Sequence, residues 1–124
     1  MNQVDQLALA RIAIGAGSWA APERALSLGG LDGAAPQSPY LGRMFGAREI
    51  ALGAVTLLAP AQQKRNMILL GLAVDALDAG AGVLAVRSAG VTPARGAVLT
   101  GAAVAAVLTG FVGLTQLRSA TPRP

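Results

Sequence analysis

Two aspartates interrupt an otherwise apolar stretch of the chain. Residues 66–86 read NMILLGLAVDALDAGAGVLAV, and Asp75 and Asp78 lie near the middle of this run. A carboxylate is costly to transfer into an apolar medium unless it is paired and hydrogen-bonded. Ionisable residues inside membrane segments are rare, and they commonly mark substrate sites, ion pathways or proton relays. The two aspartates therefore indicate a functional site or a charge network inside a bundle of helices.

Further charges lie in two other apolar segments. Arg11 belongs to the first of them, and Arg43, Arg48 and Glu49 belong to the second. A charge at the centre of a membrane costs about 2.5 to 3.5 kcal/mol unless it is paired or hydrated. The guanidinium group offers several donors in a planar fork that suits carboxylate partners. We therefore predict that Arg11, Arg48 and Glu49 face inward and form one buried network with the two aspartates, to which Arg43 adds positive charge.

Such a network suits the binding of a small molecule or acid–base chemistry. Burial and like-charge proximity separate the proton affinities of carboxylates, so that one can act as a general acid and another as a base. The candidate catalytic residues are Asp75, Asp78, Glu49 and Arg48, and the candidate ligand-binding residues are Arg11, Arg43 and Ser18. The main interpretation is a binding site for a lipophilic small molecule. The catalytic alternative is a cofactor-independent isomerase, epoxide-opening enzyme or cyclase, in which an arginine holds a developing anion.

Three other interpretations stay open. Carboxylates at the middle of a membrane are also expected in proton or ion translocation. The chain could instead be an accessory subunit of a larger membrane complex. In the simplest alternative, the network only holds weakly hydrophobic helices together. A buried ion pair seldom stabilises a protein more than well-packed apolar residues do, which favours a role beyond packing.

The composition is typical of a membrane protein. Hydrophobic residues make up 53% of the 124 residues and charged residues only 13%, whereas soluble domains carry about 25% charged residues. The net charge of +4 is spread thinly, without the basic cluster that binds a phosphate backbone, so nucleic acid is not an expected partner. The chain contains no cysteine and no histidine, and we expect neither a metal site nor a cofactor.

The helices that must position these charges can be located by length, because about 20 helical residues cross a bilayer. The sequence predicts one all-α membrane domain, residues 1–124, with crossing helices at about 5–22, 41–60, 66–86 and 97–117. Short connections favour an antiparallel four-helix bundle. The connections are 22–40, 61–66 and 87–96, and the first contains ERALSLGGL, a short interfacial helix expected to end at Gly29. Trp19 is expected at a membrane surface.

Helical spacing places the charges on faces that also carry small residues. The predicted faces are Gly71, Asp75, Asp78 and Gly82; Gly42, Gly46, Glu49 and Gly53; Arg11, Gly15 and Ser18; and Gly101, Ala105, Thr109 and Gly113. Small residues at this spacing let helix backbones approach closely inside a bilayer. These faces are therefore predicted to meet in the interior of the bundle.

The expected location is a bacterial cell membrane. An even number of crossings places both termini on one side, and a small excess of cations on that side favours the cytoplasm. The first segment lacks the basic leader and cleavage site of a secretory signal. Membrane lipid, a lipophilic ligand and either further copies of the chain or a larger membrane complex are the expected partners.

The motifs resemble those of a known group of membrane proteins. An arginine in the first helix, PYLGRMFGAREIALG at the start of the second and DALDAGAG in the third are similar to small DoxX-like four-helix membrane proteins of unknown function, of actinobacterial and fungal type. The resemblance covers about residues 5–117 and implies a membrane-embedded four-helix bundle. It implies no particular reaction, and the absence of cysteine departs from a thiol-based redox role in the wider group.

Overall fold

The regular elements that the structure describes are helices. The computed structural model describes residues 2–88, 92, 94, 108 and 110–118. The elements are α1 (Gln3–Ala20), α2 (Pro22–Leu28), α3 (Ser38–Leu58) and α4 (Ala61–Arg87), and residues 110–118 are helical as well. No strand occurs in this described part of the chain, so the predicted all-α class is confirmed there.

Local sequence signals fix the ends of the first two helices. The side chain of Asn2 accepts a hydrogen bond of 2.8 Å from the backbone N–H of Asp5, which caps the start of α1. Pro22 opens α2, where its missing N–H costs nothing. Gly29 follows the last residue of α2, and Gly30 has a φ of 87°, which favours glycine. The predicted short helix ending at Gly29 is confirmed.

The connection between α3 and α4 is shorter than predicted. Residues 61–66 were expected to form a loop, but α4 already begins at Ala61. The backbone is extended at Ala59 and Pro60, and these two residues are enough to redirect the chain. The polar residues that follow have good helix propensity, so their polarity marks the end of the apolar run and not the end of the helix.

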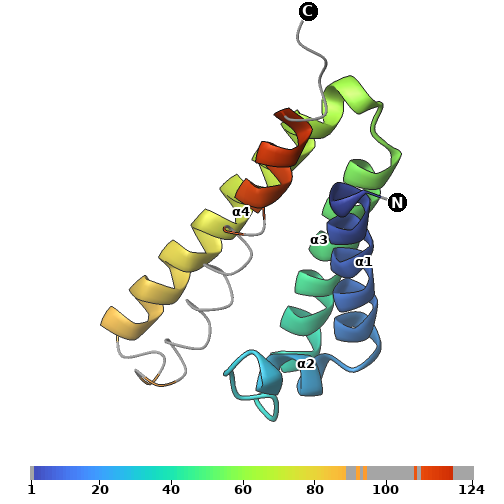
Figure 1. Ribbon diagram of the computed structural model, residues 1–124. Coiled ribbons are helices and arrows are strands. Elements are labelled where there is room, and N and C mark those ends of the chain that lie inside the picture. Colours follow the sequence, from blue (N-terminus) through green and yellow to red (C-terminus); the bar gives the residue numbers. More distant parts are fainter. Residues whose placement is uncertain (1, 89–91, 93, 95–107, 109, 119–124) are drawn as a thin grey trace, which may run out of the picture.

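Helices α1 and α3 lie side by side along their length (Figure 1). Glycines on both helices make this possible. A Cβ added to Gly15 would lie 2.5 Å from the carbonyl oxygen of Gly46, and a Cβ on Gly46 would lie 2.5 Å from that of Gly15. Two turns further along α3, a Cβ on Gly53 would lie 2.5 Å from the carbonyl oxygen of Ala8. The two backbones are therefore in direct contact, as in membrane helix pairs with small residues.

Helix α4 starts beside the end of α3 and then diverges from the α1–α3 pair (Figure 1). The helical residues 110–118 lie along the first half of α4, where Gly110 faces Leu72 and Gly113 faces Ile68. Most of the predicted fourth segment, with Gly101, Ala105 and Thr109, lies outside the described residues. Among the described residues, side chains of α1 and α3 reach α4 through the ion pairs Arg11–Asp75 and Arg48–Asp78.

The described residues place polar groups inside and large apolar groups outside. The buried polar residues are Ser18, Ser38, Glu49, Thr56 and Asp75, and the buried hydrophobic residues are Val4, Ala8, Leu26, Leu52 and Ile68. Exposed large hydrophobic residues are far more numerous and include Ile14 (56%), Leu58 (81%), Leu77 (74%) and Leu84 (65%). Among the helices described, α4 is the one long and apolar enough to cross a membrane by length and composition.

Candidate functional site

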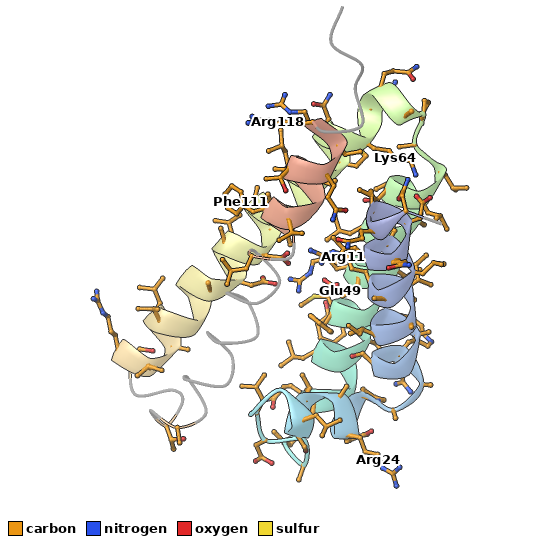
Figure 2. The ribbon with its side chains drawn as sticks, viewed as in Figure 1. Arg11, Arg24, Glu49, Lys64, Phe111 and Arg118 are labelled. Atoms are coloured by element: carbon orange, nitrogen blue, oxygen red, sulfur yellow. The ribbon has the colours of Figure 1, made fainter. Side chains whose placement is uncertain are left out.

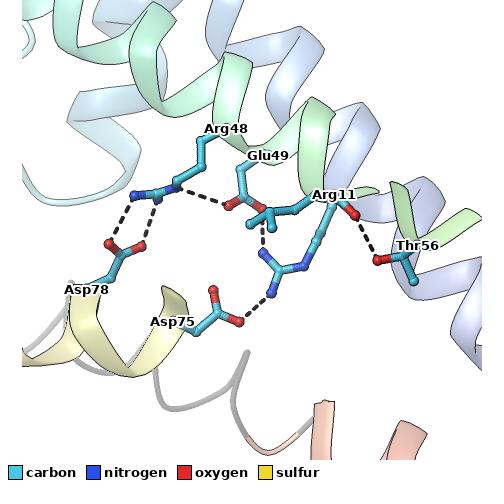
Figure 3. Close-up of polar contacts among 7 residues, drawn as sticks. Arg11, Arg48, Glu49, Thr56, Asp75 and Asp78 are labelled. Carbon is cyan, nitrogen blue, oxygen red and sulfur yellow. Dashed lines mark hydrogen bonds and ion pairs between the residues drawn. The ribbon is translucent and has the colours of Figure 1, made fainter. Parts of the chain in front are cut away.

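Arg11 joins three helices at the centre of the molecule. Its Nη1 donates a hydrogen bond of 2.8 Å to Oε2 of Glu49 on α3, and its Nη2 donates to Oδ2 of Asp75 on α4 (Figure 3). The side chains are 12%, 7% and 7% exposed for Arg11, Glu49 and Asp75. We call these three residues the inner triad. One guanidinium group thus lies between two buried carboxylates and donates a charge-assisted hydrogen bond to each.

A second ion pair lies beside the inner triad. Arg48 of α3 presents its two terminal nitrogens to the two carboxylate oxygens of Asp78 on α4, at 3.0 Å and 2.7 Å (Figure 3). We call Arg48 and Asp78 the outer pair. Their side chains are 36% and 38% exposed, so this fork-to-fork contact is much more accessible than the triad. The guanidinium of Arg48 also stacks on Phe45, 5.0 Å from the ring centre.

Glu49 connects the two groups of charges. Its Oε1 lies 3.8 Å from Nε of Arg48, which is close enough for ionic attraction but too long for a hydrogen bond. The five linked side chains are Arg11, Arg48, Glu49, Asp75 and Asp78. With every group ionised, two guanidinium groups face three carboxylates, so the network carries one excess negative charge. The excess belongs to the inner triad, because the outer pair is neutral.

The helical faces predicted from spacing position these residues. Gly42, Gly46, Glu49 and Gly53 are all buried on α3, and Gly71, Asp75 and Gly82 are buried on α4. Gly15 and Ser18 are buried on α1, one and two turns beyond Arg11. The predicted faces on α1 and α3 are therefore confirmed, and the five charges of the network come together. On α4 the predicted face is confirmed except at Asp78, which is 38% exposed, so only part of the predicted network is buried. Of the predicted fourth face, only Gly113 is described, and it is buried.

A small cavity lies against the inner triad. Its volume is about 10 Å³, which admits roughly one water-sized group. Arg11 and Asp75 form its charged wall, and the remaining walls come mainly from apolar side chains of α1, α3 and α4, with Gly110 completing the lining. Thr56 also lines it, but its hydroxyl donates a hydrogen bond of 2.7 Å to the carbonyl oxygen of Leu52. The cavity is thus an apolar space with one charged side.

Two of the predicted site residues lie outside the network. Ser18 is buried, and its hydroxyl donates a hydrogen bond of 2.6 Å to the carbonyl oxygen of Gly42, which ties α1 to α3. Arg43 is exposed on α3 and forms no ion pair with any residue that the structure describes. The structure thus places Ser18 at a helix contact and Arg43 on the surface, and brings together the other five.

Two polar features were not foreseen from the sequence. Thr56 continues the inward face of α3 one turn beyond Gly53, so the same helical spacing could have found it. Asp5 forms an ion pair with Lys64, which joins the start of α1 to the start of α4 at one end of the molecule. This ion pair was harder to predict from the sequence, because it depends on α4 beginning at Ala61, within a segment that was predicted to be a loop.

No protein-family model, curated protein or solved structure matches the chain. The resemblance to DoxX-like membrane proteins accordingly stays a prediction. In the ranges that the structure covers, no three His, Cys, Asp or Glu side chains are grouped in a way that could hold a metal ion. The properties of the site must therefore be argued from its own geometry.

Proposed function

We propose that the chain is an integral membrane protein with four crossing helices, whose charge network is a binding site for a lipophilic small molecule. The observation that carries the proposal is the inverted distribution of polarity. Charged side chains of α1, α3 and α4 are buried together, whereas large apolar side chains cover the outside of the same helices. In water this outer surface would be an unusually large exposed apolar area. In a lipid bilayer the same distribution is the expected one.

The depth of the triad supports the membrane assignment. Trp19 and Tyr40 are exposed at one end of the α1–α3 pair, as expected of aromatic side chains at a membrane surface. Lys64 marks the opposite end, and Figure 2 shows Arg11 and Glu49 between that end and Arg24. At 1.5 Å per residue, Glu49 is about 13 Å from both Tyr40 and Leu58 along α3. The triad would therefore lie near the middle of the bilayer.

Three features favour binding over a purely structural role for the charges. The backbone contacts at Gly15 and Gly46 hold α1 and α3 together without help from the charges. The excess negative charge would be unnecessary in a network that only joins helices. The cavity beside Asp75 provides a small space, and the outer pair next to the triad is partly exposed. Pockets with apolar walls and few polar groups are typical of small-molecule sites.

The same geometry gives less support to acid–base catalysis. A general acid or base must be free to exchange a proton with the substrate. Each of the three carboxylates is held in an ion pair with a guanidinium group, whereas a general acid needs a carboxyl group outside such a pair. We therefore propose binding as the function, with the four-helix DoxX-like layout as the scaffold that the sequence motifs suggest.

Co-purification tests the binding proposal. The full chain is extracted in a mild detergent, and molecules that accompany it are identified by native mass spectrometry. We expect one lipophilic molecule per chain, lost from Asp75→Asn and retained by Arg43→Met, because Arg43 lies outside the network. Circular dichroism and gel filtration establish that both variants fold. A folded Asp75→Asn protein that carries the same molecules as the wild type would overturn the proposal.

A further inference from the structure

We propose that the ligand carries a primary ammonium group, so that the site recognises a lipophilic amine whose head binds Asp75. This inference rests on the proposed binding function and specifies its ligand class. It is derived from the charge of the network, the free oxygen of Asp75 and the size of the cavity.

The excess negative charge of the network favours a positively charged ligand. Among the residues that the structure describes, Arg11 is the single cation in contact with both Glu49 and Asp75, and the outer pair compensates itself. An uncompensated charge in a low-dielectric interior is unfavourable, whereas a ligand with one positive charge makes the network neutral. A carboxylate or phosphate ligand would instead raise the excess of negative charge to two. A monovalent cation is therefore the ligand that the electrostatics favour.

Asp75 offers the acceptor for that cation. Its Oδ2 accepts from Arg11, but its Oδ1 has no hydrogen-bond partner among the described residues (Figure 3). The side chain is 7% exposed, and Oδ1 is not among its fully enclosed atoms, so a small donor can reach it. An ammonium N–H donating to Oδ1 would satisfy this acceptor and leave the contact with Arg11 in place.

The cavity restricts the size of the head group and favours an alkyl tail. A primary ammonium group is similar in size to a water molecule, and the volume of about 10 Å³ admits one such group. The apolar walls include Leu7, Leu52, Met67, Ile68 and Leu72. The head group fills this volume, so the alkyl tail would lie outside the cavity, against the apolar outer surface of the helices. A trimethylammonium head is several times larger and would require these side chains to move.

Three probes with the same twelve-carbon chain test this inference. The full-length protein is placed in nanodiscs of zwitterionic lipid, and saturable binding of radiolabelled dodecylamine, dodecanol and dodecanoate is measured after subtraction of uptake by empty nanodiscs. We expect saturable binding of dodecylamine alone, at about one molecule per chain. Asp75→Asn should weaken it at least about tenfold, and Arg43→Met should not change it. Dodecyltrimethylammonium should compete at least about tenfold less well than dodecylamine in the wild type, a comparison that needs no variant.

The outcomes separate this inference from the binding proposal. Saturable binding of dodecanol or dodecanoate that depends on Asp75 would overturn the amine as ligand class and leave a binding site in place. Dodecylamine binding that persists in folded Asp75→Asn, or that dodecyltrimethylammonium displaces equally well, would overturn the assignment of the head group to Asp75. The absence of saturable dodecylamine binding would also overturn the inference, because a proton or a residue of the chain would then balance the charge.

Discussion

Gly15 on α1 and Gly46 on α3 bring two helix backbones into direct contact. A Cβ on either residue would lie 2.5 Å from the carbonyl oxygen of the other, a distance that side chains do not tolerate. Because the neighbouring atoms belong to backbone, the helices would have to move apart. This contact determines how far Arg11 must reach, since Arg11 lies one turn from Gly15 on the same face of α1.

Replacing Gly15 with alanine should therefore destabilise the protein by about 1 to 3 kcal/mol, the usual cost of overpacking. Gly17→Ala is the matched control, because a Cβ there meets nothing within 4 Å. It should be neutral or slightly stabilising, since alanine is the better helix former. Unfolding of both variants in mixed micelles, followed by circular dichroism, measures the difference. Equal stability of the two variants would contradict the close backbone contact.

Arg11→Met should be the most destabilising single change in the network. It removes the cation shared by Glu49 and Asp75 and leaves two buried carboxylates facing each other, which costs about 3 to 5 kcal/mol. Adding Glu49→Gln and Asp75→Asn to the same chain should recover part of this loss, because no buried charge then remains in the triad. The free energy of unfolding of the single and triple variants provides the measurement. Arg43→Met, on the exposed side of α3, serves as the control and should change stability by less than about 0.5 kcal/mol.

The outer pair should contribute less than the triad. Arg48 and Asp78 are more than one-third exposed, so solvent or lipid head groups compete with their contact. A double-mutant cycle with Arg48→Gln and Asp78→Asn should give a coupling energy of about 0.5 to 1.5 kcal/mol, in the range of polar contacts between membrane helices. Arg48→Lys should lose most of this coupling, because an ammonium group cannot form the two-pronged contact. A coupling energy near zero would show that the pair does not join α3 to α4 in the membrane.

Helical spacing was sufficient to predict the inward faces and the gathering of five charges. Helical spacing also explains why Arg43 does not belong to the charge network. Residues 43 and 48 are five positions apart, which separates their directions by about 140° around a helix. Since Arg48 faces α4, Arg43 must point to a different side of α3. Arg43 was included in the predicted network only because its positive charge helps to balance the three carboxylates.

The pairing of the charges could not be predicted in the same way. Arg11 of α1 forms an ion pair with Asp75 of α4, whereas Arg48 of α3 forms one with Asp78. This choice depends on how far α4 diverges from the α1–α3 pair, which follows from the backbone at Ala59 and Pro60. The role of the Ser18 hydroxyl could not be predicted from helical spacing either. Its spacing placed it on the inward face, but only the approach of Gly42 shows that its hydroxyl is used in packing.

The depth of the helices can be measured with single cysteines, because the natural chain has none. Ile14 and Leu77 are 56% and 74% exposed and lie near the level of the triad, whereas Leu28 of α2 is 84% exposed at one end. Spin labels attached to cysteines at the first two positions should be more accessible to oxygen than to a water-soluble nickel complex, and a label at position 28 should show the reverse. The reason is that oxygen concentrates in the bilayer core and the nickel complex stays in water. If labels at positions 14 and 77 were reached readily by the nickel complex, the apolar outer surface would face water or an aqueous cavity, and a site at the middle of a membrane would be excluded.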